Sequence, residues 1–344
     1  MKKMLLALLL APALLSAQGR APDFSKPVWT SPIEFTELYW VRELSDGRLI
    51  VPDPGEGAIR LVGADGRLLG TIGRRGGGPQ EFQIPLHPLA LPGDSTLIND
   101  RDQQRFLLIG PDGKPVRTIP WPTLPLGGDG LRDQVRSDGR GNLYFPRSSF
   151  QPDQVNTPIL RWNVSSGRID SVQVVGMAKR VRSKTTIDGH EAYSTRVVPY
   201  DEGDVWGVAP NGAVAVVRPR EYLLEWRAMD GAIHRGTPIP YDGVPVTPAE
   251  RTERFGPGVD LPIPATKPAV TPLGITISPA NEIWVSRYKA PGDSGSRWDV
   301  LDKEGRLLRS LTLPGRRRVV GFGRSLIYVV RYDEDDVQHL EAYR

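Results

Sequence analysis

The chain has 344 residues, of which 39% are hydrophobic and 24% charged, and its 44 Lys and Arg residues against 40 Asp and Glu residues give a net charge of +4. This basic excess is too small to indicate a nucleic-acid-binding protein, since that class concentrates far more positive charge on one face. There is no cysteine, which excludes a disulfide and a thiol-linked lipid anchor.

The first segment has the pattern of a secretory signal peptide. Lys2 and Lys3 precede an apolar run over residues 4–15, and the small residues Ser16 and Ala17 follow it. The apolar run is too short to span a bilayer. We therefore expect a signal peptide over 1–17, a linker over 18–26 and an exported domain over 27–344, located in the periplasm or the medium and without a membrane span.

The rest of the chain repeats one β-rich unit of roughly 40 to 50 residues, with no helical period inside it. Five Gly-containing turns separate strands within the repeats: Asp65-Gly66, Asp112-Gly113, Ser166-Gly167, Asp230-Gly231 and Glu304-Gly305. Six apolar strands follow other tight turns and contain the anchors Val51, Ile98, Phe145, Val216, Val285 and Val329. The pattern predicts an all-β fold, a six-bladed β-propeller with four-stranded antiparallel blades, in which strands a to d run from the innermost to the outermost.

The sixth repeat is one strand short, because the chain ends within its third strand, at 337–344. The segment 27–35 precedes the first innermost strand, expected over 37–44, and has no other predicted partner. We expect it to close the ring as the outer strand of the last blade, which would remove the exposed sheet edge that an open ring leaves.

A non-repeating insert of about 241–270 lies between the fourth and fifth repeats. Thr247, Pro248 and Glu250 match a capping box with proline at the first helical position, so a short helix through about Phe255 is predicted. The insert is either a lid or partner-docking arm, or an elaboration without a binding role.

Several segments resemble a known family. Residues 44–53 and 73–82 resemble the NHL-type six-bladed β-propeller repeat, and residues 282–285 and 331–337 are similar to exported bacterial propellers of the same group. The resemblance implies the propeller shape and export, whereas the activity of such scaffolds varies from one protein to another.

Charged residues recur two positions after the anchors, and side chains two apart on a strand share a face. If the blades are related by rotation, these residues form a ring on the upper face, where strand b connects to strand c. The predicted ring contains Asp53, Asp100, Arg147, Arg218, Arg287 and Arg331. Arginine forks suit carboxylate, phosphate or sulfate. The ring therefore predicts either an acidic ligand (a small molecule, a glycan or a protein partner) or pairing with acidic side chains of the chain itself.

We accordingly expect a monomeric binding module without a cofactor rather than an enzyme. The alternative is a metal-dependent hydrolase of the lactonase or esterase type that uses calcium in the central channel. No metal-ligand pattern and no Gly-x-Ser-x-Gly elbow is found in the sequence, so no catalytic or metal-binding residue is assigned. Of the four histidines, His87 is the one predicted to lie near the channel.

Overall fold

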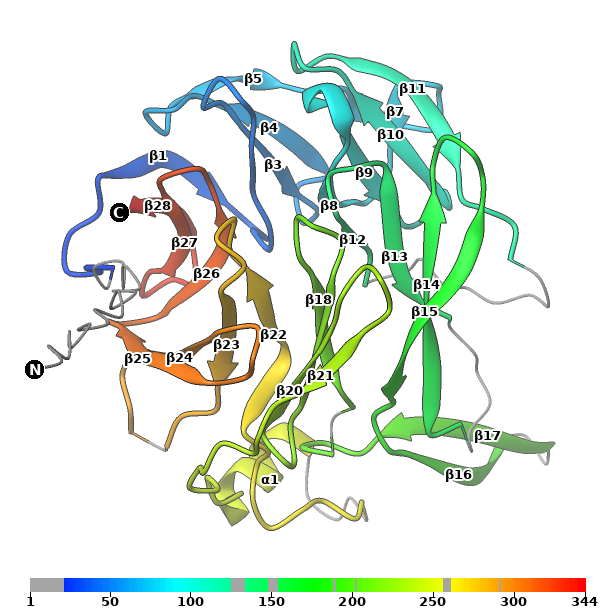
Figure 1. The fold of residues 1–344 in the computed structure, drawn as a ribbon, viewed down its shortest axis with the longest axis vertical. Helices are drawn as coiled ribbons and strands as arrows, with labels where there is room; N and C mark the ends of the chain where they lie inside the picture. The colour runs from blue at the N-terminus through cyan, green and yellow to red at the C-terminus, as the bar shows by residue number, and fades with distance from the viewer. Residues whose placement is uncertain are drawn as a thin grey trace, which may run out of the picture.

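The computed structural model describes residues 22–124, 134–147, 154–187, 190–201, 203–255, 261–290 and 292–344. Six four-stranded antiparallel sheets surround a common centre, as Figure 1 shows. The predicted six-bladed propeller is thus confirmed. The predicted signal peptide, residues 1–17, lies outside the described residues.

The first three blades follow one another along the chain, and the order of strands in each runs from the innermost to the outermost. Blade one contains β2 (Arg42–Glu43), β3 (Leu49–Asp53), β4 (Ala58–Val62) and β5 (Leu68–Thr71). Blade two contains β8 (Pro85–Ala90), β9 (Thr96–Asp100), β10 (Arg105–Ile109) and β11 (Pro115–Pro120), with a 3-10 turn at Pro92–Asp94. Blade three contains β12 (Arg136–Ser137), β13 (Asn142–Pro146), β14 (Asn156–Asn163) and β15 (Ile169–Gly176).

The second half of the ring has the same order from the centre outward. Blade four contains β18 (Val205–Val208), β19 (Val214–Arg218), β20 (Leu223–Arg227) and β21 (Ile233–Arg235). Blade five contains β22 (Val270–Ile277), β23 (Ile283–Arg287), β24 (Ser296–Leu301) and β25 (Leu307–Leu313). Blade six contains β26 (Arg317–Phe322), β27 (Ile327–Tyr332), β28 (Gln338–Tyr343) and β1 (Trp29–Phe35).

The predicted turns between strands c and d are present. Gly66 has a φ of 82° between β4 and β5, and the four equivalent glycines also have positive φ. Glycine adopts this region without the steric cost that a Cβ imposes, which explains why one residue type marks five equivalent turns.

The ring closes through its two chain ends, as predicted. β1 pairs antiparallel with β28, with Trp29 opposite Ala342 and Phe35 opposite Gln338. Phe35 is only 2% exposed and packs in a cluster that also contains Val51 of blade one. The first strand therefore completes the last blade and also contributes to its contact with the first blade.

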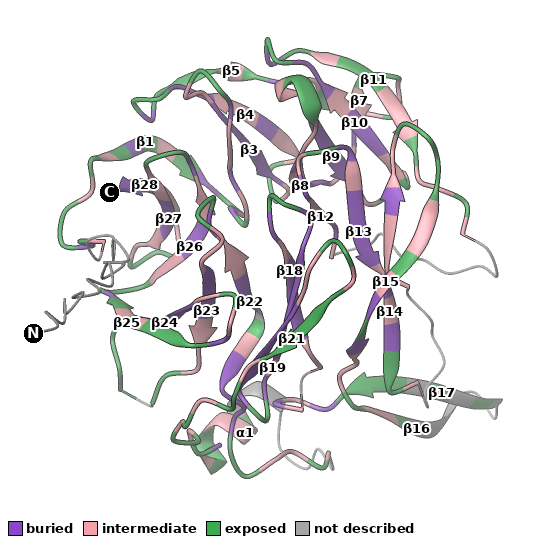
Figure 2. Cartoon of the chain, in the orientation of Figure 1, coloured by how far each residue is buried: buried purple, intermediate pink, exposed green. Residues whose placement is uncertain are grey.

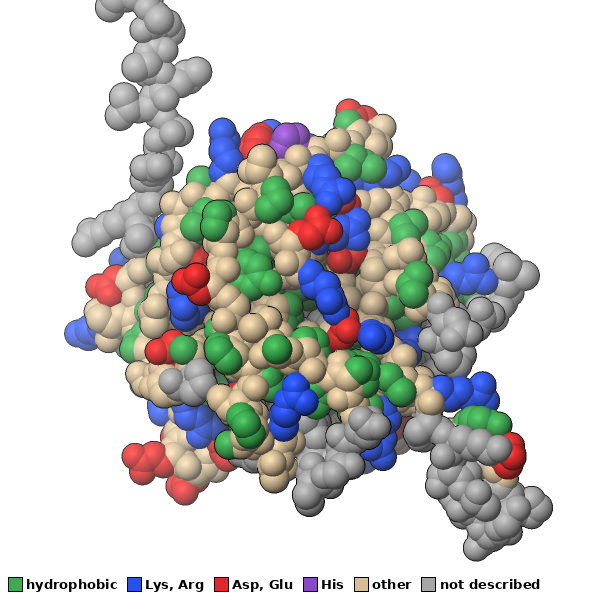
Figure 3. All heavy atoms as spheres, turned by 90° about the horizontal axis from the view of Figure 1, so that it is seen from below, with side chains coloured by type: hydrophobic (Ala, Val, Ile, Leu, Met, Phe, Trp, Pro, Cys, Tyr) green, Lys and Arg blue, Asp and Glu red, His purple; other side chains and the backbone are tan. Residues whose placement is uncertain are grey.

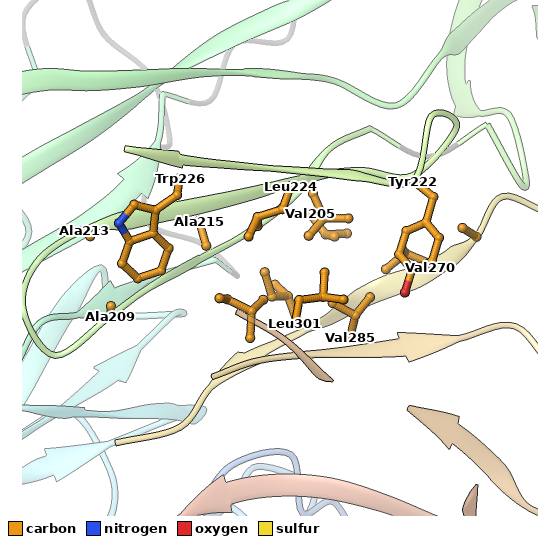
Figure 4. Close-up of a cluster of buried hydrophobic side chains, with 14 residues drawn as sticks. Val205, Ala209, Ala213, Ala215, Tyr222, Leu224, Trp226, Val270, Val285 and Leu301 are labelled. Atoms are coloured by element: carbon orange, nitrogen blue, oxygen red, sulfur yellow. The ribbon is translucent and has the colours of Figure 1, made fainter. Parts of the chain in front are cut away.

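The hydrophobic core is divided among the contacts between neighbouring blades. All six anchors are fully buried, and β3 and β9 are buried along their whole length (Figure 2). Figure 4 shows the cluster between blades four and five, which contains Trp226 and Leu224 of β20 together with Val285 and Leu301 of blade five. Burial of each large aliphatic or aromatic side chain contributes about 1.5–3 kcal/mol, so blade-to-blade packing holds the ring together.

The insert contains the predicted helix, α1 (Pro248–Phe255). The backbone N of Thr247 lies 3.1 Å from Glu250 Oε2, and the backbone N of Glu250 lies 3.2 Å from Thr247 Oγ1. These two hydrogen bonds form the predicted capping box.

Two small sheets were not predicted, and one predicted strand is shorter than expected. β16 (Arg180–Ile187) and β17 (His190–Val197) form a hairpin between blades three and four. β6 (Arg74–Arg75) pairs in parallel with β7 (Glu81–Phe82) in the glycine-rich connection before blade two. The innermost strand expected over 37–44 is shorter, since β2 contains only Arg42 and Glu43, and the amides of Thr36 and Glu37 before it bind the side chain of Asp53.

Candidate functional site

The two aspartates of the predicted ring bind backbone amides of their own blades. Asp53 is fully buried and accepts hydrogen bonds from the amides of Thr36 and Glu37, at 3.1 and 3.0 Å. Asp100 is equally buried and accepts from Gln83 and Ile84, each at 3.2 Å. Burial raises the pKa of Asp100, which these amides oppose. Both carboxylates thus fix the chain where it enters an innermost strand.

The arginines of blades four and five lie against carboxylates of the same blades. Arg218 forms ion pairs with Asp204 and with Glu225, the latter at 2.7 Å. Arg287 pairs with Asp299 and donates to the carbonyl of Ala269 at 2.7 Å. Both guanidinium groups therefore already bind carboxylate or carbonyl oxygens of the chain itself.

Blade six repeats this arrangement. Arg331 Nε lies 2.9 Å from Glu341, which also accepts from Arg317 at 2.8 Å and from the hydroxyl of Tyr343 at 2.6 Å. In blade three the backbone N of Arg147 donates to the carbonyl of Pro158 at 2.9 Å.

A pattern of charge underlies these pairs. In blade one the acid, Asp53, is on strand b and a base, Arg60, is on strand c opposite Val51. In blades four to six the acids lie at the corresponding positions of strand c, opposite the anchors: Glu225, Asp299 and Glu341. No ion pair of the described residues joins two members of the predicted ring. Its role in anion binding stays a prediction.

A cavity of about 650 Å³ lies at the centre of the ring. All six blades supply lining residues, most of them from the strands β2, β8, β12, β18, β22 and β26 and the residues next to these strands, with Ser286 and Trp298 added from β23 and β24. The innermost strands therefore form the wall of a central channel, which lies within the size range of small-molecule sites.

The wall contains two aromatic rings in contact, one from blade one and one from blade two. The ring centroids of Trp40 and His87 are 3.7 Å apart, and the ring planes are tilted by 33°. His87 is 3% exposed, and neither ring nitrogen has a hydrogen-bond partner among the described residues. Burial, and to a lesser degree the positive charge of Arg136, holds the pKa of His87 well below its usual value, so the imidazole is neutral at pH 7.

Three guanidinium groups of the described residues line the channel, and they differ in their partners. Arg42 pairs with Asp94 at 3.2 Å. Arg318 donates to the carbonyl of Leu38 at 2.8 Å. Arg136 donates to the carbonyl of Val135 at 3.0 Å and takes part in no ion pair of the described residues. Burial alone lowers the pKa of Arg136 to about 10, so this group stays charged at pH 7, and no carboxylate in the described part of the chain pairs with it.

Sequence reasoning predicted His87 near the channel but missed Arg136. The signal that could have identified Arg136 is its position two residues before an a-to-b turn, but Arg42 occupies the same position in its own blade. The structure distinguishes the two arginines, because it shows which residues of the next blade lie opposite each of them.

The described residues contain no group of three or more His, Cys, Asp and Glu side chains that could hold a metal ion. On the face shown in Figure 3, basic and acidic side chains are interspersed rather than segregated. Within the described ranges, no helix is long and apolar enough to cross a membrane.

The fold and its central channel define a six-bladed β-propeller. No protein-family model matches the chain, and no curated protein matches it. Among solved structures, a member of the DUF4221 family from Bacteroides vulgatus is similar, with a TM-score of 0.56 at 11% identity over 94% of this chain and 97% of that one.

Two further structures are similar. A Bacteroides fragilis protein that carries the name of an exported protein has a TM-score of 0.54 at 12% identity, over 94% of both chains. Virginiamycin B lyase from Staphylococcus aureus has a TM-score of 0.44 at 11% identity, over 90% of this chain and 86% of its own. The first two likenesses show the fold alone, and the third carries no argument about activity.

Proposed function

We propose that this chain is an exported binding protein that takes a small acidic ligand into its central channel. The signal-peptide pattern at residues 1–17 supports export, as does the name of the similar Bacteroides fragilis protein. The observation that carries the binding proposal is the cavity of about 650 Å³ to which every blade contributes. Binding sites of this kind are concave, mostly apolar and furnished with a few polar groups.

The ring of charged residues on the upper face is a second place for an acidic ligand. Arg287 also lines a smaller cavity of about 200 Å³ together with Tyr241 and Asp299. A ligand acid at the ring would have to compete with Asp204, Glu225 or Asp299 for its arginine, whereas the channel contains a guanidinium group with no carboxylate partner among the described residues. We therefore favour the channel.

The NHL-type resemblance and the hydrolase alternative remain predictions. Lactonase or esterase turnover that a chelator abolishes would favour the alternative. None of the described contacts favours it over binding.

The test is a titration calorimetry screen with D-glucuronate, D-galacturonate and citrate, followed by a variant that fills the channel. Thr276 on β22 lines the cavity, and Thr276→Trp places a large ring inside it. We expect at least about tenfold weaker binding, which corresponds to about 1.4 kcal/mol. Affinity should also fall as salt is added, because salt screens charge.

Thr312→Trp is the matched control, because Thr312 is exposed on β25, the outermost strand of the same blade. Its affinity should equal that of the unaltered protein. Equal binding by both variants, each shown to be folded by circular dichroism, would place the ligand outside the channel and contradict the proposal.

A further inference from the structure

We infer that Arg136 is the residue of the channel that recognises the anionic group of the ligand, and that this group is a carboxylate on a small molecule. The inference rests on the proposed function and deepens it, since it assigns one residue and one chemical group to the site. Two arginines of the same ring, Arg42 and Arg136, differ in a way that supports it.

Arg42 and Arg136 occupy equivalent places in blades one and three. Each lies two residues before the residue whose amide closes the a-to-b turn, Leu44 N to Arg48 O at 2.7 Å in one blade and Asp138 N to Asn142 O at 3.4 Å in the other. Equivalent backbone positions in a ring of similar blades direct their side chains toward equivalent parts of the next blade.

The next blade provides three acceptors for Arg42. Its guanidinium group binds the carboxylate of Asp94 at 3.2 Å, the carbonyl of Ser95 at 2.7 Å and the hydroxyl of Thr96. All three partners belong to the a-to-b turn of blade two or begin the strand after it. This environment provides both a counter-charge and hydrogen-bond acceptors.

The corresponding turn of blade four offers Arg136 no such set. Leu91 N to Ser95 O closes the turn of blade two at 2.9 Å, and Ala209 N to Ala213 O closes that of blade four at 2.9 Å, so the two turns have the same length. The residues that replace Asp94, Ser95 and Thr96 are Gly212, Ala213 and Val214. None of their side chains has an oxygen. Arg136 instead lies over the ring of Trp206, 5.6 Å from its centroid.

The consequence is a charge that no carboxylate of the described residues neutralises. Burial depresses the pKa of Arg136 only to about 10, and no acidic side chain in the described ranges offsets this effect. An uncompensated charge enclosed by protein is unfavourable. Because Arg136 lines the cavity and is still partly exposed there, its free N–H groups meet the space that a ligand would fill. A planar carboxylate matches this fork.

A second unpartnered group belongs to the same wall. His87 on β8 is buried, both of its ring nitrogens lack partners, and its titration responds to the charge of Arg136. A neutral imidazole offers one donor and one acceptor. His87 on β8 and Arg136 on the neighbouring β12 thus both have hydrogen-bonding capacity that the described residues do not use.

The test compares acids with their uncharged esters, using D-glucuronate and methyl D-glucuronate, and benzoate and methyl benzoate, in titration calorimetry. The unaltered protein should bind an acid at least tenfold more tightly than its ester. In Arg136→Gln the two affinities should come within about threefold of each other, because the loss of the guanidinium group removes the preference for charge. Arg136→Lys should retain part of the preference.

Thermal unfolding separates binding from a structural role. Arg136→Gln removes an uncompensated charge, so its melting temperature should stay the same or rise. Arg42→Gln leaves Asp94 without its ion-pair partner and should melt at a lower temperature. A fall for Arg136→Gln as large as that for Arg42→Gln would show that Arg136 is structural and overturn the inference.

The remaining outcomes distinguish the inference from the proposed function. If the unaltered protein binds acid and ester equally, or if Arg136→Gln keeps the preference for the acid, the inference fails and channel binding stands. If neither acids nor esters bind, both fail.

Discussion

Glu341 shows how single residues stabilise this ring. It is 2% exposed and accepts hydrogen bonds from Arg317, Arg331 and Tyr343. Burial opposes its ionisation, but the hydrogen bonds from Arg317, Tyr343 and Arg331, together with the charge of Arg317, hold the pKa of Glu341 below its usual value. The carboxylate therefore joins the first three strands of blade six.

We predict that Glu341→Gln lowers the free energy of unfolding by about 3–5 kcal/mol, because it leaves two arginines without their counter-charge. Urea unfolding followed by circular dichroism would measure the loss. Glu304→Gln is the control, since Glu304 lies in an exposed c-to-d turn and pairs with an exposed Arg306, an interaction worth less than about 1 kcal/mol. Equal midpoints for the two variants would contradict the role given to Glu341.

The sequence predicts which residues follow the anchors, but it does not predict their partners. The spacing that places Asp53 and Arg218 two residues after Val51 and Val216 is local and follows from strand geometry. Their partners depend on the register of strand c, and the loops between strands b and c differ in length. Arg136 was missed for a related reason, because its partners would come from another blade.

Among the elements, β1 is the one whose packing partner is most distant in sequence, since it pairs with β28. It covers the outer edge of β28, places Phe35 in the core and contacts blade one through Ser31 Oγ, which donates to the carbonyl of Gly66 at 2.7 Å. The gap in the sixth repeat predicted this strand.

We predict that a chain beginning at residue 36 has lost at least about 5 kcal/mol of stability, since loss of the buried Phe35 side chain alone costs about 3–5 kcal/mol and backbone pairing is lost as well. Differential scanning calorimetry would measure the fall in melting temperature. A chain beginning at residue 22 keeps every described residue and is the control. If the two chains melt at the same temperature, β1 does not close the ring.

The two additional elements differ in how well sequence predicts them. The helix α1 was predicted because Thr247, Pro248 and Glu250 form a local capping pattern. The hairpin of β16 and β17 was missed because it does not repeat, although the sequence has an Asp-Gly pair at residues 188–189, a common hairpin signal.

For the whole molecule, pH acts on stability through His87. Its folded pKa lies well below 6.5 because burial, and then the charge of Arg136, disfavours the protonated ring. The unfolded chain takes up this proton near pH 6.5, whereas the folded chain does not. Stability from this residue is therefore complete above pH 6.5 and is lost as the pH falls toward the folded pKa.

We predict that the free energy of unfolding decreases between pH 6.5 and pH 5 by up to about 1.4 kcal/mol per pH unit. His87→Phe keeps a ring beside Trp40 and should have a smaller slope. Urea unfolding at pH 7, 6 and 5 would compare the two proteins. Identical slopes would mean that His87 does not control stability in this range.

The pairing of β1 with β28 also has a consequence for biosynthesis. β1 is made before all the other strands and β28 after them, so β1 gains its partner only when β28 is also present, and blades one to five can assemble while the circle is still open. Joining the two extremities of a long polypeptide is slow because of the loop entropy that it costs. Until that final step the nascent protein presents an unpaired sheet edge, and its greatest risk of aggregation falls in this interval.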